Sequence, residues 1–381
     1  MTAGPASVNR GRVVRYCRRC IMPDTRPRIV FDGDGVCNAC HTADEKQRID
    51  WDARRAEFLA LVEPYRSRDG RWDCIVPWSG GKDSSTVAYR LKHELGMNPL
   101  LVTFSPLIPN EVGERNREAL VRAGFDHLFF RPNQRAMRHL ARRFFIERGN
   151  QKVAWDAGIN TIPVQVAVRY GIRLVFYAEH GESEYGGRVL REESKRLRDL
   201  AEVIEHQIGD DPANWVDDVV GEGDLNPYRY PDVDDVAGAG VKALYFAYFF
   251  RWSMADNYDF IRAKIPFATH PGGRTPGTFT DFDSLDDKAD NVYYYMQYVK
   301  FGFGRAVRDA CRLIQNGRMT REQGVELARR FDGEFPEEYL AEMLEYLQLS
   351  RGEFAGIVDQ HRNDELWLRE GSEWKLRYPI L

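Results

Sequence analysis

The chain has 381 residues, which is room for two or three domains at roughly 100 to 200 residues each. Its 54 Lys and Arg nearly balance its 58 Asp and Glu, and a formal net charge of -4 excludes a generally basic nucleic-acid coat protein and a polyanionic tail protein. No run approaches the roughly 18 apolar residues of a membrane helix, and Met1 to Arg12 lacks the apolar core of a signal peptide. We therefore expect a cytoplasmic protein without a membrane segment.

The first motif is a pair of CxxC sequences. Cys17, Cys20, Cys37 and Cys40 follow the spacing C-x2-C-x16-C-x2-C, which is typical of structural zinc sites. Residues 29–31 read as a strand and residues 32–35 as a turn that returns the second pair to the first. We predict a zinc-ribbon module over residues 13–45 with a structural Zn²⁺, because four thiolates already close a tetrahedral shell without His41.

Arginines crowd the same segment. They are Arg10, Arg12, Arg15, Arg18 and Arg19. These arginines could contact RNA, a nucleotide-sugar phosphate or an acidic partner, or form a solvated face, and the sequence does not decide among these interpretations.

The second motif is a glycine turn between a strand and a helix. The apolar run 71–79 leads into the sequence SGGKDSS over residues 79–85, and residues 86–95 have helical character. This order brings backbone N–H groups and the positive end of a helix dipole to one point, as a phosphate group requires. The loop is not a Walker A motif, because Asp83 follows Lys82 and position 76 is Val.

SGGKDSS resembles the PP-loop of the ATP-pyrophosphatase superfamily, whose members cleave ATP between the α and β phosphates. The resemblance implies that Lys82 neutralises the pyrophosphate and that Asp83 helps to hold Mg²⁺. The remaining residues of the loop would cradle the pyrophosphate: Ser79, Gly80, Gly81, Ser84 and Ser85.

Strands and helices alternate through the rest of this region. We predict strands over 99–105, 127–131 and 173–179 and helices over 113–123, 133–147 and 162–170. The alternation predicts an α/β fold with a doubly wound parallel sheet, forming a PP-loop ATP-binding domain over residues 46–190. Ligands of such sheets lie at the carboxyl ends of the strands, so we expect Thr103 near ATP.

The segment 179–187, EHGESEYGG, follows the last of these strands. A solvated acidic loop is the simplest reading, but its place at the carboxyl end of the sheet favours a functional one. Glu179, Glu182, Glu184 and Tyr185 are therefore candidates for contacts to substrate or Mg²⁺.

Residues 191–381 form a mainly helical substrate or partner region. We predict helices over 191–207, 241–256, 286–301, 306–316 and 321–330, with Cys74 and Cys311 as core thiols. The aromatic runs 245–252 and 293–298 are assigned to packing. Two polar loops, 270–280 and 300–305, could close over an anionic substrate through Arg274, Lys300 and Arg305.

Beyond the PP-loop, the chain resembles the N-acetyl sugar amidotransferases of bacterial surface-polysaccharide biosynthesis from about Cys17 to about Phe354. The resemblance is carried by CIMPD at 20–24, the run from Phe31 to Cys40, and EHGESEYGG. Further matching segments are 113–116, 124–126, 132–133, 228–231, 293–304 and 320–322. One departure is Arg251-Trp252-Ser253, where Trp followed by Asp is common in the family.

This resemblance implies an ATP-dependent ligase-type reaction that converts an acetamido group of a nucleotide-linked or nonulosonic N-acetyl sugar into an acetamidino group. The products would serve lipopolysaccharide or O-antigen synthesis. Lys82, Asp83, Glu179 and Glu184 would be catalytic, with Glu182 and Tyr185 binding substrate. Ammonia would come from a separate glutaminase through a barrel-type conduit subunit.

Two other interpretations remain. Some PP-loop tRNA thiolation enzymes carry an N-terminal zinc ribbon, but they generally need further active-site cysteines, and outside the ribbon this chain has only Cys74 and Cys311. Nucleic acid is therefore not the expected partner. A non-catalytic zinc scaffold that merely binds nucleotide conflicts with the intact Lys82-Asp83 pair.

Overall fold

The computed structural model describes residues 13–189, 191–198, 203 and 208–380. Its centre is a five-stranded sheet in the order β3-β2-β1-β4-β5, and every neighbouring pair is parallel. The strands are β1 Cys74–Pro77, β2 Pro99–Phe104, β3 Asp126–Phe130, β4 Leu174–Tyr177 and β5 Lys242–Tyr245. The predicted α/β class with a parallel sheet is confirmed.

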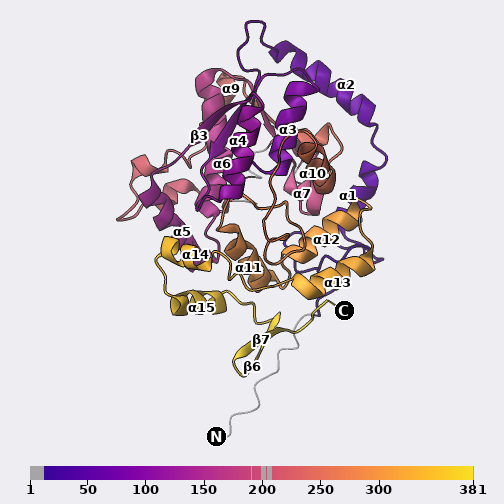
Figure 1. Ribbon diagram of the computed structural model, residues 1–381, viewed down its shortest axis with the longest axis vertical. Coiled ribbons are helices and arrows are strands. Elements are labelled where there is room, and N and C mark those ends of the chain that lie inside the picture. The colour runs from indigo at the N-terminus through magenta and orange to yellow at the C-terminus, as the bar shows by residue number, and fades with distance from the viewer. Residues whose placement is uncertain (1–12, 190, 199–202, 204–207, 381) are drawn as a thin grey trace.

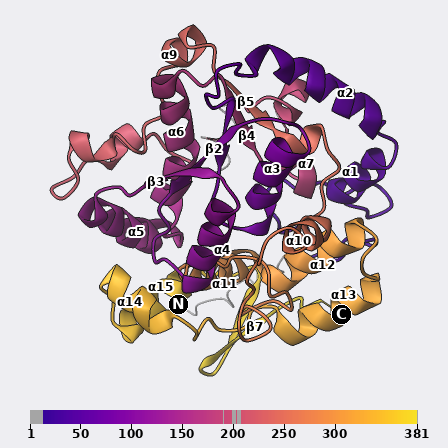
Figure 2. The ribbon, with the colours of Figure 1, turned by 45° about the horizontal axis from the view of Figure 1, so that its top comes forward.

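Helices cover both faces of this sheet, as a doubly wound fold requires (Figure 1, Figure 2). In β1, Ile75 belongs to one hydrophobic core while Cys74 and Val76 belong to the other, because successive strand residues point to opposite faces. The first core is closed by α5 Gln134–Arg148 and α6 Val153–Tyr170. The second is closed by α2 Trp51–Val62, α3 Lys82–His93, α4 Glu111–Arg122 and α10 Met254–Arg262.

The C-terminal region is mainly helical, and it lies below the sheet in Figure 1. Its helices are α11 Asp290–Phe301, α12 Arg305–Gln315, α13 Arg321–Phe331, α14 Leu340–Leu347 and α15 Arg351–Gln360, followed by the antiparallel hairpin of β6 Trp367–Glu370 and β7 Glu373–Leu376. Shorter helices are α7 Gly181–Tyr185 and α9 Val233–Gly238. The 3₁₀ helices are η1 Glu63–Tyr65, η2 Glu192–Lys195, η4 Pro212–Trp215, η5 Glu222–Leu225 and η6 Phe246–Tyr248.

The cysteine module packs on this helical region. The four cysteines share a third hydrophobic cluster with Ile21, and with Val307 of α12 and Val325 of α13. Helix α1 Asn38–Lys46 also contacts α7 and α12. The module is therefore wedged between the loop that follows β4 and the C-terminal helices (Figure 1).

Two of the predicted helices differ from the structure. The helix predicted over 241–256 is wrong: β5 forms the edge of the sheet, pairing Val175 with Ala243, and α10 begins only at Met254. A short apolar segment such as residues 242–245 suits a buried strand as well as a helix, and pairing with β4 decides between them; the aromatic residues that follow form the 3₁₀ helix η6. Within the predicted helix 191–207 the structure shows a 3₁₀ turn at Glu192–Lys195, and residues 199–202 and 204–207 lie outside the described part.

The order of strands fixes where a ligand can bind. The chain adds β2 and β3 on one side of β1 and then β4 and β5 on the other, so the direction of winding reverses between β1 and β4. Crevices at the carboxyl ends of such strands are the usual ligand sites of open α/β sheets. The loop after β1 and the loop after β4 therefore face the same crevice. Among the described residues, no helix combines the length and apolar character needed to cross a membrane.

Candidate functional site

The SGGKDSS loop connects β1 to α3. Gly81 is the N-cap of α3 and Gly80 has a φ of +96°, a conformation that side chains rarely adopt. A Cβ on Gly80 would lie 2.7 Å from Cγ of Arg117 and 3.1 Å from the carbonyl oxygen of Gly113. Arg117 in turn donates a 2.9 Å hydrogen bond to the carbonyl of Ser79. Helix α4 therefore holds the loop in place and makes glycine necessary there.

Lys82 lies at the centre of a polar cluster. Its side chain is 2% exposed, and Nζ lies 2.8 Å from Oδ2 of Asp83 and 2.7 Å from Oδ1 of Asp283. Burial lowers the pKa of Lys82, but the two carboxylates more than offset this, so the pKa is raised and the lysine is charged. Asn257 of α10 donates a 2.9 Å hydrogen bond to the other oxygen of Asp83.

The other predicted loop and strand residues differ in what they contact. Ser79 Oγ accepts from the N–H of Gly81 at 3.2 Å, and Ser84 is partly exposed on the first turn of α3. Ser85 is buried and its oxygen accepts from the indole of Trp78. Thr103 is also buried, bonded to the carbonyl of Trp78 and 2.8 Å from the ring of His127. Thr103 thus stabilises the end of β1 through this hydrogen bond to Trp78.

Glu179 follows β4 and faces the same crevice. Burial raises the pKa of Glu179 to about 7, with the charge of Asp83 adding to the effect and Arg312 opposing it. The phenol of Tyr185 donates to Oε1 of Glu179 at 3.1 Å, and the Arg312 guanidinium lies 3.8 Å from the centre of the Tyr185 ring. A carboxyl group with this pKa can accept or release a proton near neutral pH.

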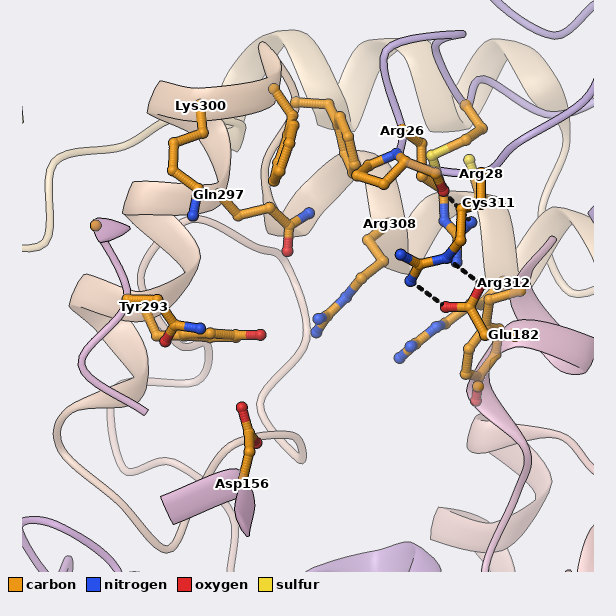
Figure 3. A pocket seen from close by; sticks show the side chains of 18 of the residues that line it. Arg26, Arg28, Asp156, Glu182, Tyr293, Gln297, Lys300, Arg308, Cys311 and Arg312 are labelled. Atoms are coloured by element: carbon orange, nitrogen blue, oxygen red, sulfur yellow. Dashed lines mark hydrogen bonds and ion pairs between the residues drawn. The ribbon is translucent and has the colours of Figure 1, made fainter. Parts of the chain in front are cut away.

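A cavity of about 480 Å³ opens beside these groups. Figure 3 shows Arg308 and Arg312 reaching into it from α12, with Asp156 and Tyr293 on the opposite side. Five cationic residues line the cavity against two carboxylates: Arg26, Arg28, Lys300, Arg308 and Arg312, with Asp156 and Glu182. A cavity of this size and charge suits a small anionic ligand.

The acidic segment after β4 is divided among different partners. Glu182 forms a two-point ion pair with Arg28 at 2.8 and 2.7 Å in the cavity wall. Glu184 forms an ion pair with Lys46 of α1. Both contacts tie α7 to the cysteine module, so two of the predicted functional carboxylates also hold the module against the domain.

Of the three cations predicted to bind substrate, only Lys300 lines the cavity, where it donates to the carbonyl of Arg148 at 3.0 Å. Arg274 forms a two-point ion pair with Glu334 at 2.6 and 2.8 Å, outside the cavity lining. Arg305 is 1% exposed and donates to the carbonyl of Asp283 at 2.7 Å. Arg305 therefore supports the loop that carries Asp283.

Sequence reasoning missed several residues of this site. Asp283 lies in the aspartate-rich stretch 281–290, where the sequence alone does not single out one carboxylate. Arg308 and Arg312 are spaced i, i+4, which places both on one face of α12 and could have marked them. Asp156 of α6 faces the cavity, accepts no hydrogen bond on its carboxylate from a described residue, and has a pKa raised to about 7 by burial.

The four cysteines converge as the spacing predicts. Their sulfur atoms all lie within 4.8 Å of one another, and each residue is at most 1% exposed. Sγ of Cys17 lies 3.9 Å from that of Cys40, and Sγ of Cys20 lies 3.6 Å from that of Cys37. Sulfurs at tetrahedral positions around zinc, with bonds of about 2.3 Å, are about 3.8 Å apart. The donor set and spacing therefore fit a single metal ion.

Two of the described arginines of the N-terminal segment form local ion pairs, and Arg18 is exposed. Arg15 pairs with Asp24 at 3.1 Å and Arg19 pairs with Asp44. Arg10 and Arg12 lie outside the described residues.

These features define an α/β protein with an SGGKDSS loop at the switch point of its sheet, an N-terminal tetracysteine module whose sulfur atoms could hold a metal ion, and a helical C-terminal region. Residues 276–379 match the model of a family described as the C-terminal domain of WbpG-like lipopolysaccharide (LPS) biosynthesis proteins. That matched segment supplies the α11 and α12 wall of the cavity.

A search of curated proteins gave no match. Among solved structures, the chain is similar to the U34-tRNA thiolase NcsA from Methanococcus maripaludis with its [4Fe-4S] cluster, at 12% identity and a TM-score of 0.30. The similarity covers 81% of this chain and 88% of that one.

Proposed function

We propose that this protein is an ATP-dependent amidotransferase of surface-polysaccharide biosynthesis that converts the acetamido group of an N-acetyl sugar into an acetamidino group. One observation carries the proposal: Asp283 contacts both Lys82 of the SGGKDSS loop and Arg308 of the cationic cavity, and the cavity wall from α11 and α12 belongs to the segment that matches the WbpG-like family. The pathway would be the synthesis of lipopolysaccharide or O-antigen.

The reaction has two steps. The amide oxygen attacks the α-phosphate of ATP, the bond to the β-phosphate oxygen breaks, and pyrophosphate leaves. Ammonia then attacks the imidate carbon, the carbon–oxygen bond breaks, and AMP leaves. Overall, the reaction consumes the amide, ATP and ammonia and forms the amidinium, AMP and pyrophosphate. An amide carbonyl is a poor electrophile, and converting its oxygen into part of AMP makes it a leaving group.

The loop residues would serve the first step. The N–H groups at the start of α3 and the Lys82 ammonium would stabilise the charge on the departing pyrophosphate. Mg²⁺ would supply further neutralisation of the phosphates, and Asp83, whose carboxylate lies beside Lys82, is the residue that would hold it.

Glu179 would serve the second step. Attacking ammonia must lose a proton as the new carbon–nitrogen bond forms, and a carboxylate with a pKa of about 7 is suited to receive it. Tyr185 would keep that carboxylate oriented through its 3.1 Å hydrogen bond. Glu184, the residue before Tyr185 on α7, remains a proposed participant in this step.

The cationic lining favours an acceptor that carries negative charge, either a nucleotide-linked sugar or a nonulosonic acid. Lys300, Arg308 and Arg312 come from the C-terminal helices, Arg28 from the cysteine module and Asp156 from the α/β domain, so the acceptor would contact all three regions of the chain. Zn²⁺ is the metal proposed for the tetracysteine site, with a structural role.

Ammonia is proposed to come from a separate glutaminase with a barrel-type conduit subunit. Cys74 is fully buried in β1 and Cys311 is 1% exposed on α12, so neither is placed as an exposed glutaminase nucleophile.

Mass spectrometry tests the proposal. The protein is incubated with ATP, Mg²⁺, ammonium and a panel of nucleotide-linked and nonulosonic N-acetyl sugars. Replacing the amide oxygen by NH lowers the sugar mass by about one unit, and this loss should accompany AMP and pyrophosphate release. Asp83→Ala should abolish pyrophosphate release while the fold persists, and full activity of that variant would contradict the PP-loop mechanism.

The same assay also tests the alternative function, tRNA thiolation. Cys311 lines the cavity, and a thiol in that position is what tRNA thiolation would use. If no sugar changes mass while bulk tRNA stimulates AMP release in a Cys311-dependent way, thiolation replaces amidation as the proposed reaction.

A further inference from the structure

A second, much smaller cavity lies behind the substrate cavity. Its volume is about 20 Å³, enough for one molecule the size of water or ammonia. It shares three lining residues with the substrate cavity, namely Tyr185, Arg312 and Gln315. The small cavity thus lies directly behind the residues that flank Glu179.

A third cavity, of about 240 Å³, adjoins the small one. The two share Lys46 and Glu184, which form an ion pair whose side chains are 13% and 11% exposed. The third cavity lies between α1, α2, α7 and the end of β5, and it reaches solvent at the exposed residues Glu45 and Glu192.

From this arrangement we propose that the three cavities form an internal passage along which ammonia reaches the activated acceptor. Ammonia enters the third cavity at the surface, passes the Lys46–Glu184 pair, and arrives beside Tyr185 and Glu179. The proposal rests on the amidotransferase function and adds to it the route of the nitrogen donor.

The charges of the small cavity favour neutral ammonia. Lys46, Arg251 and Arg312 line the small cavity against the single carboxylate of Glu184. Two of these cations are held in place, Lys46 by Glu184 and by the carbonyl of Trp252 at 3.2 Å, and Arg312 over the Tyr185 ring. An ammonium ion would be repelled there, while ammonia carries no charge and can exchange hydrogen bonds along the wall.

The route also separates ammonia from water, the two nucleophiles that compete for the adenylated amide. Ammonia arrives from behind α7, while the acceptor enters the large cavity from the opposite side of the Tyr185–Arg312 contact. A bound acceptor would therefore close the large cavity to water without closing the supply of ammonia.

Plugging variants test the passage. Ala43 lines the small cavity and Thr42 lines the third, and neither lines the substrate cavity. Ala43→Phe, Ala43→Leu and Thr42→Phe should lower kcat/KM for free ammonia by about tenfold or more, since each fills the route. ATP–pyrophosphate exchange measured with acceptor and without ammonia should be unchanged. Ala56→Phe adds the same side chain to an exposed position of α2 and should change neither quantity.

Metal content and thermal stability identify any variant that fails to fold, and Ala43→Leu then replaces Ala43→Phe. If folded Ala43 variants keep the wild-type kcat/KM for ammonia, the passage is wrong. If only the Thr42 variant does so, entry through the third cavity is wrong. If the wild-type protein forms no amidine with any acceptor, the proposed function itself fails, and that result is distinct from an active enzyme that plugs do not slow.

Discussion

Nζ of Lys82 lies 2.7 Å from Oδ1 of Asp283, although the two residues are 201 positions apart in the chain. Asp283 also lies 3.7 Å from Arg308, so one carboxylate joins the PP-loop to the cationic wall of the cavity. Ser284, the next residue, has a φ of +55°, an uncommon conformation for serine that turns the chain at this point. The PP-loop lysine is thus already paired with a carboxylate where phosphate is proposed to bind.

Replacing Asp283 by Asn should change both affinity and stability. Removing one carboxylate beside Lys82 and Arg308 makes the site more positive, so the Kd for inorganic pyrophosphate should fall severalfold, measured by calorimetric titration. The free energy of unfolding should fall by about 1 to 3 kcal/mol, because a buried lysine loses one of its two hydrogen-bonded partners. Weaker pyrophosphate binding by a stable variant would contradict this arrangement.

Glu179→Gln should remove a pH dependence. Because burial raises the pKa of Glu179 to about 7, the carboxylate that accepts a proton becomes protonated as the pH falls below that value. In the wild-type protein, kcat/KM for free ammonia should therefore decline below about pH 7. The variant should be slower by about 100-fold and lack this decline. If the variant shows the same decline of kcat/KM below about pH 7, a group other than Glu179 causes the decline.

Asp156→Asn should stabilise the protein at alkaline pH. The pKa of Asp156 is raised by burial to about 7, so the folded state binds a proton that the unfolded state releases at lower pH. The wild-type protein therefore loses stability as the pH rises from about 4 through about 7. The variant should melt at a higher temperature than wild type at pH 8 and at nearly the same temperature at pH 4. An equal shift at both pH values would show that charge is not the cause.

Cys37→Ser should lower the metal content below that of the wild-type protein and reduce its stability. The four sulfurs form the centre of the small cluster that packs on α12 and α13, so loss of one ligand should loosen the module before it affects chemistry. Elemental analysis and thermal melting check this outcome. The buried Cys74→Ser, far from the module in β1, is a matched control that should keep the metal. A folded, metal-replete but inactive Cys37 variant would argue against a structural role.

Local sequence was enough for the motifs that lie within one short segment. The CxxC pairs and the SGGKDSS turn place their groups through a few bonds of backbone, and the alternation of strands and helices predicts the parallel sheet. Glu179 could be placed near the PP-loop because parallel strands present their carboxyl ends on one edge. The same local reasoning failed over residues 242–245, a short segment that is compatible with helix or strand until its neighbour β4 is known.

Contacts between distant segments had to come from the tertiary structure. Asp283, Arg308 and Asp156 belong to a loop and two helices with no motif of their own, and their positions depend on how the C-terminal helices pack over the sheet. The same packing pairs Arg274 with Glu334 and buries Arg305, so a cation in a polar loop does not by itself indicate a ligand. Backbone geometry fixes what lies a few residues away, whereas side-chain packing across the whole chain decides which charges face the cavity.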